Sequence, residues 1–176
     1  EGNDYYFRVC FLDPFQGTVM ASYANEQGYK KAAVISQNGD DYSTGLAAYF
    51  KEAFTSLGGE IVADETYQTN ETDFNAILTT VKAAEPDVIF APSSIATATL
   101  LLPQAKAMGI TAQIMAGDTW ENETIISDAA EGVVLSTFFD EHDTKNTVAA
   151  DFVKGFKAYL NSDKANITAN GNTDGV

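Results

Sequence analysis

Short apolar runs rich in β-branched residues alternate along this chain with longer stretches that have the 3.6-residue period of a helix. Runs such as Ala32–Ile35 and Val88–Ala91 are apolar on both faces, as strands of a covered parallel sheet must be. Between them, stretches such as Ser43–Leu57 carry a single apolar stripe. Strands that alternate with helices in this way predict an α/β fold, a doubly wound and mostly parallel sheet with helices on both faces.

The boundaries of these elements follow from the same periodicity and from glycine and proline. Gly58-Gly59 ends one helix, since glycine adopts the left-handed conformation cheaply, and Pro103 should kink another. The predicted strands are Tyr5–Val9, Lys31–Ser36, Glu60–Thr66, Asp87–Ala91, Ala112–Ala116 and Gly132–Phe138. The predicted helices are Gln16–Gln27, Ser43–Leu57, Thr72–Ala84, Ser94–Met108, a short one near Asn122–Ala129 and a last one between His142 and Leu160.

The alternation stops near Phe139. The last helix is followed by no strand, and residues 161–176 are polar and contain no closing element. No predicted helix or strand precedes the strand Tyr5–Val9. We therefore expect the chain to be a piece of a longer protein.

Charge and composition exclude several classes of partner. The 176 residues include 10 Lys and Arg against 25 Asp and Glu, which gives a net charge of −15 at pH 7. A surface this negative repels nucleic acids and anionic lipid headgroups. No apolar stretch approaches the ~20 residues that a membrane-spanning helix needs. Cys10 is the single cysteine, which excludes an internal disulfide and a multi-cysteine metal site.

The chain lacks the common catalytic motifs. The nucleophile elbow, the phosphate loop and the dinucleotide fingerprint are absent. His142 is the only histidine and is predicted to lie in a solvated loop, and Cys10 is predicted to be a buried, inert thiol among apolar neighbours. Asp40-Asp41 is typical of a phosphoacceptor pocket, but no lysine stands where that chemistry needs one. The sequence therefore predicts no enzyme, no metal and no cofactor.

Functional side chains instead gather where the predicted strands end. In an open α/β sheet, ligands bind at the carboxyl ends of the strands. A helix cap accounts for Asp41. Asp118 precedes a better cap, Asn122, by four residues, so a structural role and a ligand contact remain equally open for it. The side chains at these ends are the hydroxyls of Ser93, Ser94 and Thr119, the aromatic rings of Tyr42 and Trp120, and the carboxylates of Asp41 and Asp118.

Several short motifs, in order and at compatible spacing, resemble a known family along nearly the whole chain. The chain is similar to the second lobe of a type I periplasmic binding protein. The closest subgroup is the leucine/isoleucine/valine-binding proteins that serve amino-acid ABC transporters. The matching motifs are Phe7-Arg8, Asp13 and Gln16-Gly17, Ala32–Ile35 with Asp41-Tyr42, Pro86–Ile89, Gln104–Gly109, and Ala129–Val134.

This resemblance implies a two-lobed protein that holds an amino acid between its lobes by hinge closure. Residues 1–10 would then be a crossing strand from a first lobe that this chain lacks, residues 11–139 the second lobe, and residues 140–176 a return segment whose helix belongs to the first lobe. Asp118 falls on the position of the acid that meets the ligand's α-ammonium group, and Tyr42 on a tyrosine bordering the pocket. Hydrogen bonds would come from Ser93, Ser94, Thr119 and Tyr42, and Trp120 would supply an apolar wall.

The resemblance also implies a cellular context and partners. We expect a periplasmic or extracellular protein, lipid-anchored through a segment ahead of this chain, whose partner is the membrane permease of an ABC transporter. Because the chain presents half a cleft, we expect weak or no ligand binding, and self-association, when it is isolated. The alternatives are an extracellular ligand-sensing domain of a kinase or chemoreceptor, and an enzyme on a flavodoxin-like scaffold.

The chain departs from the family pattern at two places. Ser43 stands where a glycine commonly follows the tyrosine, and Ser93 and Ser94 stand where relatives often have bulky tyrosines. The smaller side chains leave the identity of the ligand side chain open, whether aliphatic, polar or aromatic.

Overall fold

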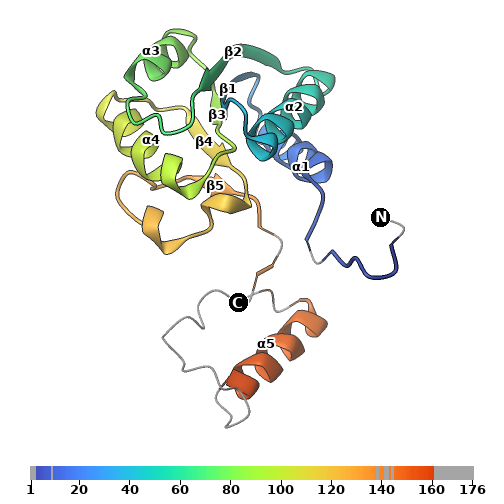
Figure 1. The fold of residues 1–176 in the computed structure, drawn as a ribbon. Coiled ribbons are helices and arrows are strands. Elements are labelled where there is room, and N and C mark those ends of the chain that lie inside the picture. The colour runs from blue at the N-terminus through green and yellow to red at the C-terminus, as the bar shows by residue number, and fades with distance from the viewer. Residues whose placement is uncertain (1–2, 9, 138, 141–142, 144, 161–176) are drawn as a thin grey trace. The chain divides into compact units, whose positions relative to one another are not determined.

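The computed structural model describes residues 3–8, 10–137, 139–140, 143 and 145–160. The chain divides into two compact units, Glu1–Ser136 and Thr137–Val176. The first unit is built on a five-stranded parallel sheet with strand order β2-β1-β3-β4-β5 (Figure 1). Its strands are β1 (Lys31–Gln37), β2 (Glu60–Tyr67), β3 (Val88–Phe90), β4 (Gln113–Ala116) and β5 (Val134–Leu135). Its helices are α1 (Asp13–Glu26), α2 (Asp41–Ser56), α3 (Asn75–Ala83) and α4 (Ile95–Ala107), with the 3₁₀ turns η1 (Asp118–Trp120) and η2 (Glu123–Ile125).

Helices cover both faces of this sheet, as the continuous apolar runs predict. Ala32 and Val34 of β1 pack in a cluster with α1 and α2, whereas Ala33 and Ile35 pack in a second cluster with α3 and α4. Figure 1 shows α1 and α2 on one side of the sheet and α3 and α4 on the other. The α/β doubly wound architecture predicted from the sequence is confirmed.

The strand order reverses between β1 and β3. The chain passes from β1 outward to β2, then returns to place β3 on the other side of β1. The loop after β1 therefore leads to α2 on one face, and the loop after β3 leads to α4 on the other. In open α/β sheets, ligands bind at the carboxyl ends of the strands where the loops diverge in this way.

Most predicted elements are present with shifted ends. Helix α1 begins at Asp13, with a proline in its first turn where a missing N–H is tolerated. Helix α4 continues through Pro103. Near Asn122 the predicted helix is wrong: a single 3₁₀ turn forms there, capped by the Asn122 side chain. Strand β5 comprises two residues rather than the predicted Gly132–Phe138, because β4 pairs with it only at Met115 and Ala116.

The predicted strand Tyr5–Val9 is also wrong for the residues that can be compared. Residues 3–8 form no strand, and the side chains of Tyr5 and Phe7 are 92% and 83% exposed. An apolar segment with no neighbouring strand has no ladder to join, so its residue pattern cannot define a strand by itself. The thiol of Cys10 is exposed for the same reason, which corrects the prediction of a buried cysteine.

The second unit contains the predicted last helix, α5 (Thr147–Leu160). The ring of Phe152 stacks on Phe156, with centroids 5.7 Å apart, and meets the ring of Phe139 edge-on at 6.0 Å. Val148 and Phe152 remain 77% and 53% exposed. His142 lies outside the described residues.

Candidate functional site

Asp118 lies at the carboxyl end of β4, in the first position of η1. Its Oδ1 atom accepts two hydrogen bonds, from Gln16 Nε2 at 2.8 Å and from the Tyr42 hydroxyl at 2.8 Å. Among the described residues, no donor reaches its second oxygen, Oδ2, and no lysine or arginine forms an ion pair with it. The carboxylate is half-buried. One of its oxygens is therefore fixed while the other is uncommitted.

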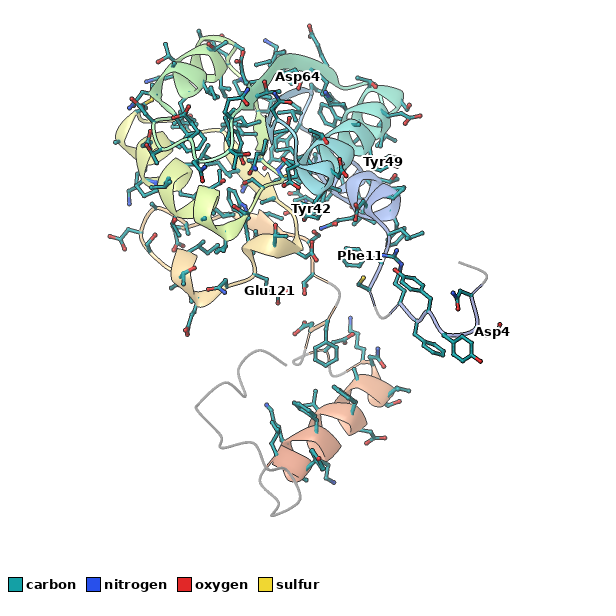
Figure 2. The ribbon with its side chains drawn as sticks, viewed as in Figure 1. Asp4, Phe11, Tyr42, Tyr49, Asp64 and Glu121 are labelled. Atoms are coloured by element: carbon teal, nitrogen blue, oxygen red, sulfur yellow. The ribbon has the colours of Figure 1, made fainter. Side chains whose placement is uncertain are left out.

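Tyr42, labelled in Figure 2, comes from the first turn of α2. The Asp40 side chain caps this helix by accepting from the Tyr42 N–H, so the cap is Asp40 and not the predicted Asp41. Burial, together with the hydrogen bond to Asp118 and its charge, raises the pKa of Tyr42 to about 12, although Thr119 and Gln16 lower it. The hydroxyl is therefore protonated at neutral pH and donates to Asp118.

Gln16 is a buried polar residue on α1, with 2% of its surface exposed. Its amide nitrogen donates to Asp118 and also to Ser136 Oγ at 2.7 Å, just beyond the end of β5. Gly117 makes this convergence possible: a Cβ there would lie 2.1 Å from the Tyr42 hydroxyl oxygen and 3.0 Å from Gln16 Nε2. The glycine is needed for space, since its backbone is extended.

Ser93, Thr119 and Trp120 form a second set of bonds beside Asp118. The Thr119 hydroxyl donates to the Ser93 carbonyl at 2.6 Å and lies 3.5 Å from the Tyr42 hydroxyl. Trp120 Nε1 donates to Ser93 Oγ at 3.2 Å. Trp120 and Ser93 are 0% and 1% exposed, and the indole packs in the α3/α4 core. In this conformation the Trp120 side chain lies beneath the loop after β3 and supports it through Ser93. It exposes no surface that could form the predicted apolar wall.

Ser94 and Ser43, which lie at the starts of α4 and α2, differ in exposure. Ser94 is exposed and caps α4. Ser43 is fully buried, accepts from the Gln37 N–H at 2.8 Å and donates to the Pro92 carbonyl. It therefore ties the end of β1 to the end of β3, a brace that a glycine could not supply.

The structure thus brings four of the six predicted side chains to one surface, and it adds residues that sequence reasoning did not assign. Asp118, Tyr42, Ser94 and Thr119 have exposed or half-buried side chains there, whereas Ser93 and Trp120 lie beneath. Sequence reasoning did not assign Gln16, Gly117 or Ser136 to the site. Gln16 shares the buried face of α1 with Met20, Ala21 and Ala24, and a glutamine on such a face was the available signal, because a buried amide requires partners.

This arrangement can accept a hydrogen bond from a cationic or polar ligand through Asp118 Oδ2. Within the described residues, no group of three His, Cys, Asp or Glu side chains could hold a metal ion. None of the helices described reaches the length and apolarity required to cross a membrane. A cavity of about 300 Å³ lies at the other edge of the sheet, between the end of α4 and the start of β4.

The relatives of this chain are binding proteins. It is 32% identical over 162 residues to Leu/Ile/Val-binding protein homolog 3 of Brucella melitensis, an alignment that covers 90% of this chain and 43% of the relative. It is 29% identical over 153 residues to the leucine-, isoleucine-, valine-, threonine- and alanine-binding protein of Pseudomonas aeruginosa, covering 84% of this chain and 41% of that protein. The chain spans less than half the length of these relatives.

Solved structures show the same fold. The leucine binding protein LivK of Thermotoga maritima superposes with a TM-score of 0.80 at 33% identity, over 92% of this chain and 47% of LivK. LivJ of Streptococcus pneumoniae, solved in complex with isoleucine, superposes with a TM-score of 0.78 at 32% identity, also over 92% and 47%. Residues 1–175 match the family described as periplasmic binding protein. This chain therefore belongs to the type I periplasmic binding protein family, in the group of branched-chain amino acid-binding relatives.

Proposed function

We propose that this chain is the second lobe of the solute-binding protein of an ABC transporter, which binds an amino acid between two lobes by hinge closure. The observation that carries the proposal is Asp118. Its carboxylate is half-buried at the carboxyl edge of the sheet, with one oxygen held by Gln16 and Tyr42 and no cation partner among the described residues. Its charge is therefore available to a ligand.

The chemistry of an amino-acid ligand explains why such an acid is needed. A zwitterion that leaves water must have each charge compensated, since an unpaired charge in a closed cleft is costly. Asp118 Oδ2 would accept from the α-ammonium group. Tyr42, Ser94 and Thr119 would supply hydrogen bonds at the same surface, while Ser93 and Trp120 hold the loop beneath them.

The location and partners follow from the same proposal. The complete protein would be periplasmic or extracellular, lipid-anchored through a segment ahead of this chain, and would deliver its ligand to a membrane permease. Residues 1–10 would enter from the first lobe, and residues 140–176 would return to it. We favour transport over a receptor's sensing domain and over an enzyme, since the named relatives and neighbours are binding proteins and transporter components.

The decisive test is Asp118→Asn in the complete protein, with leucine, isoleucine, valine, threonine and alanine titrated by calorimetry. Removing a buried charge partner costs roughly 2–5 kcal/mol of binding free energy, so binding should fall below detection. Asp128→Asn, at an exposed carboxylate elsewhere in the first unit, removes the same charge and should leave affinity unchanged. Unchanged affinity in Asp118→Asn would exclude this carboxylate from the site.

The isolated chain should bind these amino acids far more weakly than the complete protein and should self-associate. Leu12, the N-cap residue of α1, and Phe15 and Val19 within the helix are spaced three and four residues apart, and their side chains are 44%, 62% and 41% exposed. Exposed apolar surface of this kind favours association. Light scattering should therefore show species larger than a monomer at high concentration, and a strictly monomeric chain would contradict this expectation.

A further inference from the structure

Gln16 is a donor to Asp118 that is also hydrogen-bonded to a third segment of the chain. Its Nε2 atom donates one hydrogen to Asp118 Oδ1 at 2.8 Å and the other to Ser136 Oγ at 2.7 Å. With 2% of its surface exposed, Gln16 cannot itself present a group to a ligand. Both hydrogens of the amide are therefore used to join three segments: α1, the end of β4 and the end of β5.

This geometry restricts the direction of the uncommitted oxygen of Asp118. A carboxylate with a single partner can still rotate about its side-chain torsions. Two donors that converge on Oδ1 from different helices, Gln16 on α1 and Tyr42 on α2, leave Oδ2 with a fixed direction. Hydrogen bonds to an ionised group are also the stronger ones. A group fixed before binding spares the ligand the entropy of ordering it.

We propose that Gln16 is a positioning residue that orients Asp118 toward the ammonium group of the ligand, with Ser136 as its anchor. The inference rests on the proposed function, because it takes Asp118 as the ammonium contact. It predicts that loss of the Gln16 amide weakens ligands that carry an α-ammonium group and spares those that lack one. A purely structural glutamine would not discriminate between the two.

The test is Gln16→Met in the complete protein, since methionine keeps the length of the side chain and removes both donors. Leucine binding is measured by calorimetry. Binding of 4-methylpentanoate, which has the same side chain and carboxylate without the ammonium, is measured by competition at millimolar concentration. Loss of one charge-assisted hydrogen bond should weaken leucine about tenfold. The affinity for 4-methylpentanoate should change by less than about twofold, because that ligand makes no ammonium contact.

Two further variants guard against a loss of fold. Ser136→Ala removes only the anchor and should weaken leucine in the same direction by a smaller factor, about threefold. Gln104→Met is the matched control: that amide also bridges two groups, the Thr72 carbonyl and the Phe74 N–H, outside the site. It should lower the melting temperature and leave leucine affinity unchanged.

The outcomes separate this inference from the proposed function. Equal weakening of both ligands by Gln16→Met, or unchanged leucine affinity, would overturn the positioning role while Asp118→Asn still tests the site. Failure of the unmodified protein to bind leucine would overturn both. Selective loss of leucine in Gln16→Met and Ser136→Ala, with Gln104→Met unaffected, supports the inference.

Discussion

Two carboxylates at opposite edges of the same sheet are held in different ways. Asp87, at the amino edge, accepts from the backbone N–H groups of Lys30 and Lys31 through Oδ2, at 2.7 and 2.9 Å. Asp118, at the carboxyl edge, accepts from two side chains through Oδ1. Asp87 is exposed to water, whereas Asp118 is half-buried. In the part of the chain that the structure describes, both carboxylates are held through one oxygen only. An uncommitted second oxygen therefore does not by itself identify a binding site.

The donors distinguish the two roles. Backbone N–H groups belong to the strands, so Asp87 stabilises the pairing of β1 with β3, and those two hydrogen bonds lower its pKa. The donors to Asp118 are side chains from α1 and α2, which the strands do not need. This convergence of side chains on one carboxylate at the carboxyl edge of the sheet is what the proposed ammonium contact requires.

The largest effect that this comparison predicts comes from Gly117→Ala. The added Cβ would collide with the Tyr42 hydroxyl and crowd Gln16, so Asp118 should lose both donors. We expect ligand affinity, measured by calorimetry on the complete protein, to fall about a hundredfold, the combined value of two charge-assisted hydrogen bonds. Gly45→Ala in α2 meets no atom within 4 Å and should be neutral or stabilising. Similar affinities in both variants would show that the donors do not matter.

Tyr42→Phe should have an intermediate effect. It removes one donor to Asp118 without adding volume, so we expect affinity to fall about tenfold.

Because the pKa of Tyr42 is raised to about 12, wild-type affinity should be constant from about pH 7 to pH 9. The stability contributed by the neutral hydroxyl should be complete below about pH 10 and decrease as the pH rises toward 12. Denaturant titrations of the wild-type protein and of Tyr42→Phe between about pH 10 and pH 12 test this loss of stability. An equal loss of stability in Tyr42→Phe would contradict the prediction.

Asp87→Ala should leave ligand affinity unchanged, the smallest expected effect on binding. It should lower the free energy of unfolding by about 1 kcal/mol, a modest value because the group is exposed. Since the pKa of Asp87 is lowered in the folded state, its contribution is present above about pH 4 and lost as the pH falls through that lower value. Thermal melts of the two proteins should therefore differ at pH 7, and the difference should shrink as the pH falls below about 4. A weaker affinity in Asp87→Ala would remove the functional distinction between the two edges.

Local periodicity predicted the sheet and most of its helices because each buried element must repeat apolar residues at its own spacing. It failed for Tyr5–Val9, where an apolar pattern has no neighbouring strand, and for Asn122–Ala129, where a capping residue starts one turn only. The predicted strand boundaries placed Asp118 at the carboxyl edge of the sheet, where the structure also has it, because the end of an apolar run marks the end of a strand. Local periodicity could not assign Trp120, because a tryptophan beside a strand end can face either the core or the surface.

The amino-acid sequence by itself determined the α/β architecture, the net negative charge and the position of Asp118 at the carboxyl edge of the sheet, because these depend on composition and on repeats within single elements. Only the tertiary structure decided that Gln16, Tyr42 and Ser136, which are far apart along the chain, meet around Asp118 and that Gly117 leaves them room. Those contacts depend on how helices cross and on the removal of side chains from water, and no spacing along one element encodes them.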